Sequence, residues 1–122
     1  ESQIRFVGWQ QKKENRSYYA KAKIYISIPE SDGTSVSLLE AMSAGCIPVV
    51  SDLPVSYEWI ENGKNGILES PNQNPLLEAV TLDPDVFKHI NFDLIQSRAT
   101  RDACLTRFLQ CYSGIEKETY EP

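Results

Sequence analysis

The chain has 122 residues, enough for one domain with a modest core, and its 41% hydrophobic and 24% charged residues are ordinary for a globular protein. Seventeen acidic against twelve basic residues give a net charge of −5, which predicts no general attraction to nucleic acid or to an anionic membrane. No apolar run approaches the roughly 20 residues of a membrane span, so we expect no transmembrane segment.

Apolar runs of strand character alternate with helical patterns in the first half of the chain. The run 4–8 predicts a strand, and Asn15 is suited to cap a helix that leads into a second strand at 24–28. Apolar residues then recur at helical spacing until Gly45, and 47–51 predicts a buried strand. Strand, helix and strand in this order predict the α/β class with an open parallel sheet.

The second half of the chain adds one short strand and several helices. In chain order we predict a short amphipathic helix at 55–60, a turn cluster at 62–66, a strand at 67–68 and helices at 75–80, 84–90 and 94–109. Asn74 is suited to cap the helix at 75–80. The arginines of the last helix, Arg98, Arg101 and Arg107, are expected to be solvated.

The loop 30–35, which follows the strand at 24–28, is the predicted ligand site. Ligands of an open parallel sheet bind beyond the carboxyl ends of its strands. Gly33 lets the backbone approach a ligand closely, and Thr34 and Ser35 are good N-caps for the helix that follows. The unpaired amides of the first helical turn favour an anion such as a phosphate.

Glu40 follows in the same helix, about five residues or roughly 7 to 8 Å further along its axis. A nucleotide fits this spacing, with its diphosphate on the helix N-terminus and both ribose hydroxyls donating to the carboxylate. The alternative is a solvated Glu that gains a little from the helix dipole. Its apolar neighbours Leu39 and Ala41 favour ligand contact, because a carboxylate at a packed edge needs partners.

The stretch 31–52 resembles the signature of the retaining family-4 glycosyltransferases of the GT-B fold. That family carries two acidic residues eight positions apart, then Ala-Met, a Gly and Pro-Val-Val, and here the acidic pair is Asp32 and Glu40. Asp32 stands where Glu is commoner, and Gly-Thr-Ser at 33–35 replaces the common Gly-Phe-Gly. Residues 6–22 extend the resemblance with a Phe-x-Gly strand and a helix that ends near Tyr-Tyr-x-x-Ala.

The resemblance implies a Rossmann-like, C-terminal domain that binds a nucleotide-sugar donor. Asp32 would be the catalytic-site carboxylate that contacts hydroxyls of the transferred sugar, and Glu40 would hold the ribose. The amides of Gly33, Thr34 and Ser35 would line the sugar and the diphosphate. Transfer in this family keeps the anomeric configuration and uses neither a divalent metal nor a cofactor besides the nucleoside-diphosphate sugar. In agreement, no Asp-x-Asp pair of the metal-ligating type stands near the loop.

The resemblance also implies a domain organisation. Residues 1–110 would be a donor-binding domain truncated at its N-terminal side, and 111–122 a tail or crossover segment. The Arg and Lys that bind the diphosphate have no counterpart in the chain, nor has the N-terminal domain that binds the acceptor, a sugar, lipid or protein. We therefore expect the full-length protein to be a hexosyltransferase of polysaccharide or glycoconjugate biosynthesis, and these 122 residues alone to be inactive.

Two other functions stay open beside this one. A non-catalytic nucleotide-sugar-binding or interaction module would share the fold without the chemistry. A GT-B sugar-nucleotide epimerase would need catalytic carboxylates and histidines, and the chain holds a single histidine, His89, which we expect to be solvated or locally paired. The residues leave uridine, guanosine and adenosine open as the base of the donor.

The three cysteines favour a reducing, cytoplasmic location, at the inner face of a membrane if the absent domain binds there. They show no Cys-x-x-Cys spacing, and Cys104 and Cys111 on one helix would lie about 10 Å apart along its axis, beyond the reach of a disulfide.

Glu58 matches an acidic residue of the family, and we assign it a structural role.

Overall fold

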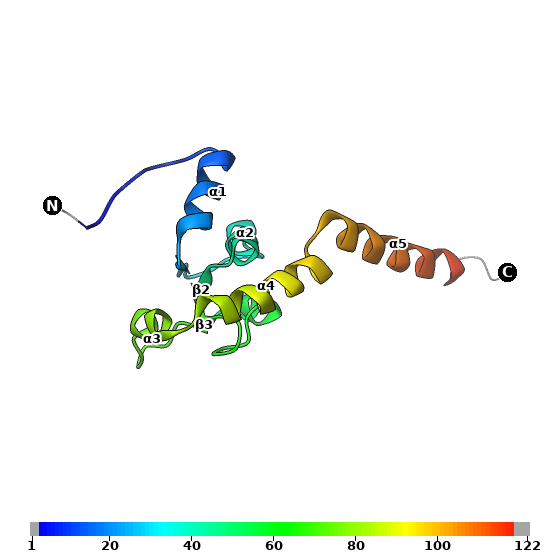
Figure 1. Cartoon of the computed structure of the whole chain (residues 1–122). Coiled ribbons are helices and arrows are strands. Elements are labelled where there is room, and N and C mark those ends of the chain that lie inside the picture. The colour runs from blue at the N-terminus through cyan, green and yellow to red at the C-terminus, as the bar shows by residue number, and fades with distance from the viewer. Residues whose placement is uncertain (1–2, 119–122) are drawn as a thin grey trace.

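The computed structural model describes residues 3–118, which form a short parallel sheet covered by helices (Figure 1). In chain order the elements are α1 (Lys12–Lys21), β1 (Ile24–Ser27), α2 (Val36–Ala44), β2 (Ile47–Val50), the 3-10 helix η1 (Pro54–Glu58), β3 (Ile67–Leu68), α3 (Pro75–Thr81), α4 (Pro84–Arg98) and α5 (Arg101–Glu118).

The sheet has the strand order β1-β2-β3, and both pairs of strands are parallel. Ile26 pairs with Val49, and Val49 pairs in turn with Ile67. The middle strand β2 is buried over its whole length, which is why its sequence is continuously apolar. The α/β class and the Rossmann-like parallel sheet flanked by helices are confirmed.

Two apolar clusters pack against the sheet. Successive residues of a strand point to opposite faces, so neighbouring Val49 and Val50 belong to different clusters. The buried residues of the first cluster are Leu38, Met42, Val50, Ile60, Leu68 and Ile95. Those of the second are Ile47, Val49, Ile67, Ala79 and Phe87. The first cluster fixes α2, the helix that follows the predicted ligand loop.

The strand predicted at 4–8 is wrong. This segment has no strand structure, and Phe6 and Trp9 in and beside it are 95% and 86% exposed. It runs away from the sheet (Figure 1), so its amides meet no strand to pair with, and strand propensity alone does not form a strand. Helix α1 begins at Lys12, before the expected cap Asn15, because the residues between them are themselves good helix formers.

The break predicted between helices at 84–90 and 94–109 is also misplaced. Helix α4 continues through Asn91, which is fully buried and whose Nδ2 donates a 2.9 Å hydrogen bond to Asn65 O. The polar residue is thus accommodated by a tertiary contact and not by a loop. The chain breaks instead at Ala99 and Thr100, where Thr100 Oγ1 accepts a hydrogen bond from the first turn of α5.

Helix α5 extends away from the sheet (Figure 1). It passes through residue 111 without interruption and ends at Glu118, so most of the segment expected as a tail is helical; residues 119–122 lie outside the described part. Apolar side chains such as Leu105, Phe108 and Ile115 are 52–64% exposed along it. The helix therefore adds little to the two clusters around the sheet.

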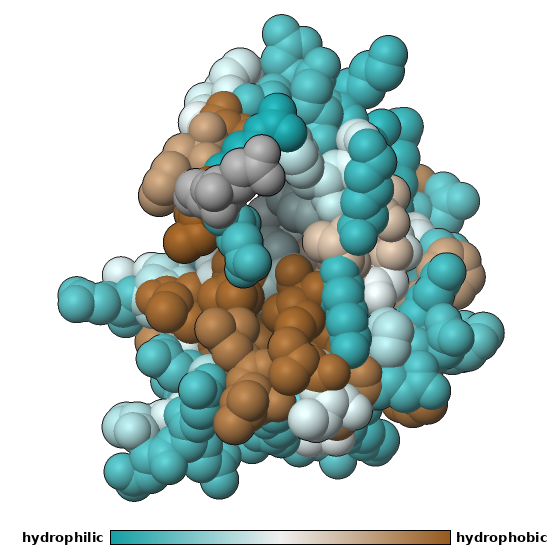
Figure 2. Space-filling view, turned by 60° about the vertical axis from the view of Figure 1, so that its left-hand side comes forward, coloured by the Kyte–Doolittle hydropathy of each residue, from teal (hydrophilic) through white to brown (hydrophobic). Residues whose placement is uncertain are grey.

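One face of the molecule carries a hydrophobic patch inside a hydrophilic border (Figure 2). Strand β1 is the edge of the described sheet, and its Ile26 and the following Ile28 are about half exposed. Just before β1, Lys23 Nζ donates a 2.8 Å hydrogen bond to Val80 O. This bond holds the start of β1 beside the end of α3.

Candidate functional site

The loop 28–35 leaves the carboxyl end of β1 and enters α2. Ser35 is the N-cap, since its Oγ accepts a 3.3 Å hydrogen bond from Leu38 N, whereas Thr34 stays outside the helix. Gly45 ends α2 in the left-handed conformation with φ 93°, as its place after the apolar run predicts. The first-turn amides of α2 are therefore presented at the edge of the sheet where α/β folds bind ligands.

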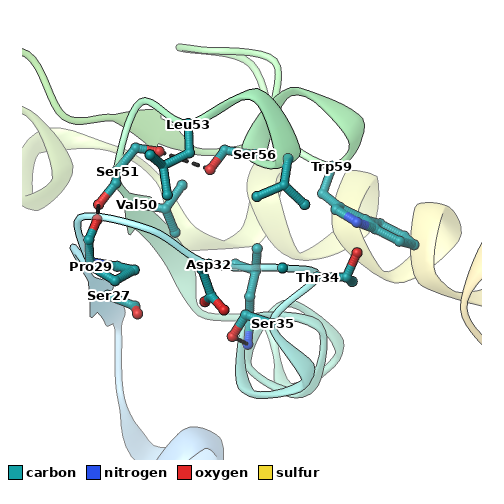
Figure 3. A pocket seen from close by; sticks show the side chains of 13 residues that line it. Ser27, Pro29, Asp32, Thr34, Ser35, Val50, Ser51, Leu53, Ser56 and Trp59 are labelled. Carbon is teal, nitrogen blue, oxygen red and sulfur yellow. Dashed lines mark hydrogen bonds between the residues drawn. The ribbon is translucent and has the colours of Figure 1, made fainter.

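A small cavity of about 30 Å³ lies between this loop and the segment that follows β2 (Figure 3). Two hydroxyls hold the second wall in place: Ser51 Oγ donates to Pro29 O at 2.7 Å, and Ser56 Oγ donates to Ser51 O at 2.8 Å. The lining residues are Ser27, Pro29, Asp32, Gly33, Thr34, Ser35, Leu38, Val50, Ser51, Leu53, Val55, Ser56 and Trp59.

The four loop residues predicted from the sequence, Asp32, Gly33, Thr34 and Ser35, all line this cavity. The first three are exposed and Ser35 is half-buried, so the loop presents its outer face to solvent. Asp32 has no hydrogen-bond or ion-pair partner within residues 3–118. Figure 3 shows its side chain near the start of α2, which leaves the carboxylate available to hydroxyls of a bound ligand.

Glu40 faces a second, open groove of about 520 Å³ on the same helix. It is half-buried and makes no hydrogen bond or ion pair with any residue that the structure describes, so its carboxylate sits at a packed edge without a partner. The groove is lined by Arg16, Tyr19, Val36, Leu39, Glu40, Ser43, Ala44, Ile95 and Ala99. The structure therefore gathers the loop residues in one cavity and Glu40 in another.

Tyr19 of α1 lines the same groove as Glu40. Burial, and then the nearby Tyr25, Glu40 and Cys46, raise the pKa of the Tyr19 phenol above its ordinary 10.0. The ring of Tyr19 meets the ring of Tyr25 edge-on, at 6.1 Å between centroids and 71° between planes. The sequence gave no sign that Tyr19 lines the groove of Glu40, because the packing of α1 on α2 brings it there.

A chain of hydroxyls reaches Ser35 from the sheet. Tyr25 Oη lies 2.7 Å from Ser37 Oγ, and Ser37 Oγ lies 2.9 Å from Ser35 Oγ. All three side chains are partly buried. Sequence reasoning did not find Tyr25 or Ser37, since a strand tyrosine and a helix serine carry no motif.

The segment around Trp59 forms the wall opposite the loop. Its indole Nε1 is buried and has no partner among residues 3–118. Arg98 is exposed, as expected, but its guanidinium also lies over the Trp59 ring, 4.5 Å from the centroid, and its Nη1 donates to Glu58 O at 2.7 Å. The Glu58 side chain is exposed, and only its backbone carbonyl makes this contact.

The described residues show no sign of a metal site or of a membrane span. The described part of the chain contains no group of three or more His, Cys, Asp and Glu residues arranged to hold a metal ion. None of its helices is both long and apolar enough to cross a membrane. His89 is exposed, and the free cysteines are the buried Cys46 and the exposed Cys104 and Cys111.

Comparison with protein families identifies the class of this protein. The model of the family described as glycosyl transferases group 1 matches residues 1–81, which is 81 of the 122 residues. The chain therefore belongs to the glycosyl transferases group 1 family. Membership implies a glycosyltransferase, with a nucleotide-sugar and an acceptor as its partners. No curated protein matches the chain.

Proposed function

We propose that the chain is the donor-binding part of a retaining glycosyltransferase that transfers a hexose from a nucleoside-diphosphate sugar to an acceptor. Asp32 and the cap Ser35 lie at the N-terminus of α2, and Glu40 lies unpartnered in a groove on the same helix. A nucleotide-sugar has matching groups, because its anionic diphosphate suits the helix N-terminus and is flanked by two sets of neutral hydroxyls that suit the two carboxylates.

In this proposal Glu40 accepts hydrogen bonds from the ribose hydroxyls. Two hydroxyl donors stabilise a half-buried carboxylate that has no protein partner more than they stabilise an exposed carboxylate, which water already solvates. The amides of Gly33, Thr34 and Ser35 line the diphosphate and the sugar, and Asp32 binds hydroxyls of the sugar. The dipole of α2 and its first-turn amides then stabilise the charge that develops on the leaving diphosphate, with no metal ion required.

The size of the cavity argues that the donor lies over the loop. Ligand sites typically enclose about 300 to 1,000 Å³, whereas this cavity measures about 30 Å³. The exposed outer face of the loop at 32–34 offers the room that the cavity lacks. The lining of the cavity contains no Lys or Arg; in this proposal basic residues outside the lining complete the diphosphate site, and these 122 residues alone transfer no sugar.

Ligand-detected NMR on the chain with UDP-, GDP- and ADP-sugars tests the proposal. We expect one donor to bind, which names the base, and Glu40→Ala to abolish its binding. Glu78→Ala is the matched control, because Glu78 is an exposed residue of α3 outside both cavities. Failure of all three donors to bind a folded sample, or equal binding by Glu40→Ala, contradicts the proposal.

A non-catalytic nucleotide-sugar-binding module is the second candidate. The departure at Asp32, a shorter carboxylate than the family's usual Glu, is the observation that favours it. In the full-length protein, Asp32→Asn should abolish sugar transfer and leave nucleotide affinity within about twofold, because the change removes a charge at the sugar and none at the ribose. A full-length protein that binds the donor and transfers no sugar identifies the binding module.

A further inference from the structure

We propose that Tyr25 is a positioning residue that couples the two cavities: its hydroxyl orients Ser35 through Ser37, and its ring braces Tyr19 beside Glu40. The inference rests on the donor-binding function proposed above. Tyr25 lines neither cavity, so it acts on a bound nucleotide only through these neighbours.

The hydrogen-bonded hydroxyls of Tyr25, Ser37 and Ser35, which we call the hydroxyl arm, donate in one preferred direction. Each of the three hydroxyls holds one proton, and Ser35 Oγ already accepts from Leu38 N. A phenol is more acidic than an aliphatic alcohol and is the better donor, which favours Tyr25 donating to Ser37 and Ser37 donating to Ser35. In that direction the proton of Ser35 is the only one not used within the chain of hydroxyls.

The free proton of Ser35 lies where an anion is proposed to bind. Ser35 lines the cavity at the start of α2, and a donor there adds to the first-turn amides. Hydrogen bonds in series polarise one another, so a phenol at the far end strengthens the donor at the near end. Without Tyr25, Ser37 has no donor from the sheet, and Ser35 is then freer to turn its proton inward to Ser37.

The contact between the rings of Tyr25 and Tyr19, which we call the aromatic arm, reaches the Glu40 groove. The ring of Tyr25 packs against the cluster around Met42, so its position is fixed by the core. Its edge-on contact with Tyr19 holds a side chain that lines the same groove as Glu40. One residue of β1 thus reaches the helix cap through Ser37 and contacts the wall of the Glu40 groove directly.

Tyr25→Phe separates the two arms, because it removes the hydroxyl and keeps the ring. We expect the affinity of the chain for the bound nucleoside diphosphate to fall by about 3- to 10-fold, the usual range for one hydrogen bond. The affinity for the corresponding nucleoside, which has no phosphate, should stay unchanged. Ser37→Ala should give the same split, and the double variant should lose no more than Ser37→Ala alone, since both changes interrupt one chain.

Tyr57→Phe is the matched control, because the Tyr57 hydroxyl bonds to the Asp52 carboxylate outside this chain of hydroxyls. Thermal melts establish that each variant is folded, and Ser37→Ala decides if Tyr25→Phe is not. A folded Tyr25→Phe or Ser37→Ala that binds the nucleoside diphosphate like the original chain overturns the inference and leaves the proposed function intact. Equal loss of nucleoside and nucleoside diphosphate also overturns it. If the original chain binds no nucleoside diphosphate, the proposed function fails and the inference fails with it.

Discussion

The Arg98 guanidinium lies over the Trp59 ring, 4.5 Å from its centroid, and so connects the end of α4 to the wall of the cavity at the start of α2. The same guanidinium donates a 2.7 Å hydrogen bond to the carbonyl of Glu58. Two contacts from one side chain therefore hold the segment after η1, whose indole also packs against the cluster around Met42.

Arg98→Ala should lower the free energy of unfolding by about 1 kcal/mol, because it removes a cation–π contact and a hydrogen bond to a backbone carbonyl. Urea denaturation followed by circular dichroism measures the change. Arg107→Ala is the matched control, as Arg107 is an exposed residue of α5 with no ion pair in the described part of the chain. Equal stability of the two variants would show that Arg98 is effectively solvated.

Met42→Ala should be far more damaging than Phe108→Ala, although Phe is the larger side chain. Met42 is fully buried in the cluster that fixes α2, and its truncation should cost about 2 to 5 kcal/mol. Phe108 is 64% exposed on α5, so its truncation should cost under about 1 kcal/mol. Urea denaturation of both variants checks the order. Comparable losses would mean that α5 packs against the rest of the molecule in solution.

The central unit of the fold could be predicted because local chemistry determines it. Ser35 caps α2, Gly45 ends it, and the continuous apolar run of β2 marks a strand buried on both faces. These signals act over a few residues, so the sequence pattern alone contains them. The loop cavity followed from the same signals, since a strand, a loop and a helix in this order place the loop at the carboxyl edge of the sheet.

Most of the errors concern contacts between distant segments. The run 4–8 has strand propensity, but a strand also needs a neighbouring strand to pair with. The sequence pattern of the run does not show whether the fold places such a strand beside it. The break predicted between 90 and 94 was wrong because the burial of Asn91 against Asn65, 26 residues away, cannot be seen locally. Tyr25 and Arg98 were missed for the same reason, since their partners are chosen by how β1 and α4 pack.

Gly45→Ala should destabilise the protein by about 1 kcal/mol or more, and Gly114→Ala should stabilise it by up to about 1 kcal/mol. Gly45 has φ 93°, and an added Cβ would come within 3.0 Å of Lys88 Cγ, so both backbone and packing oppose it. Gly114 lies within α5 with no atom near an added Cβ, and Ala is the better helix former. Thermal melts of the two variants should shift in opposite directions; a rise in the melting temperature of Gly45→Ala contradicts the αL assignment of Gly45.

Alkaline pH should destabilise the chain partly through Cys46. Burial raises the pKa of this thiol above its ordinary 9.0, so the folded state holds the proton more tightly than the unfolded state does. The contribution is fully present below pH 9 and is lost as the pH rises through the raised pKa, by at most about 1.4 kcal/mol per pH unit for one proton. Tyr19 and Tyr57, whose pKa values are also raised, add losses of the same sign above pH 10.

The contribution of Cys46 is isolated by comparing variants across pH. The free energy of unfolding of the original chain, Cys46→Ala and Cys104→Ala is measured at intervals from pH 7 to 10.5 under reducing conditions. Cys46→Ala should be less stable at pH 7, because it truncates a buried side chain, yet should lose less stability on going to pH 10.5. The exposed Cys104→Ala should follow the original chain at every pH. Parallel curves for all three would show that the Cys46 thiol ionises equally in the folded and unfolded states.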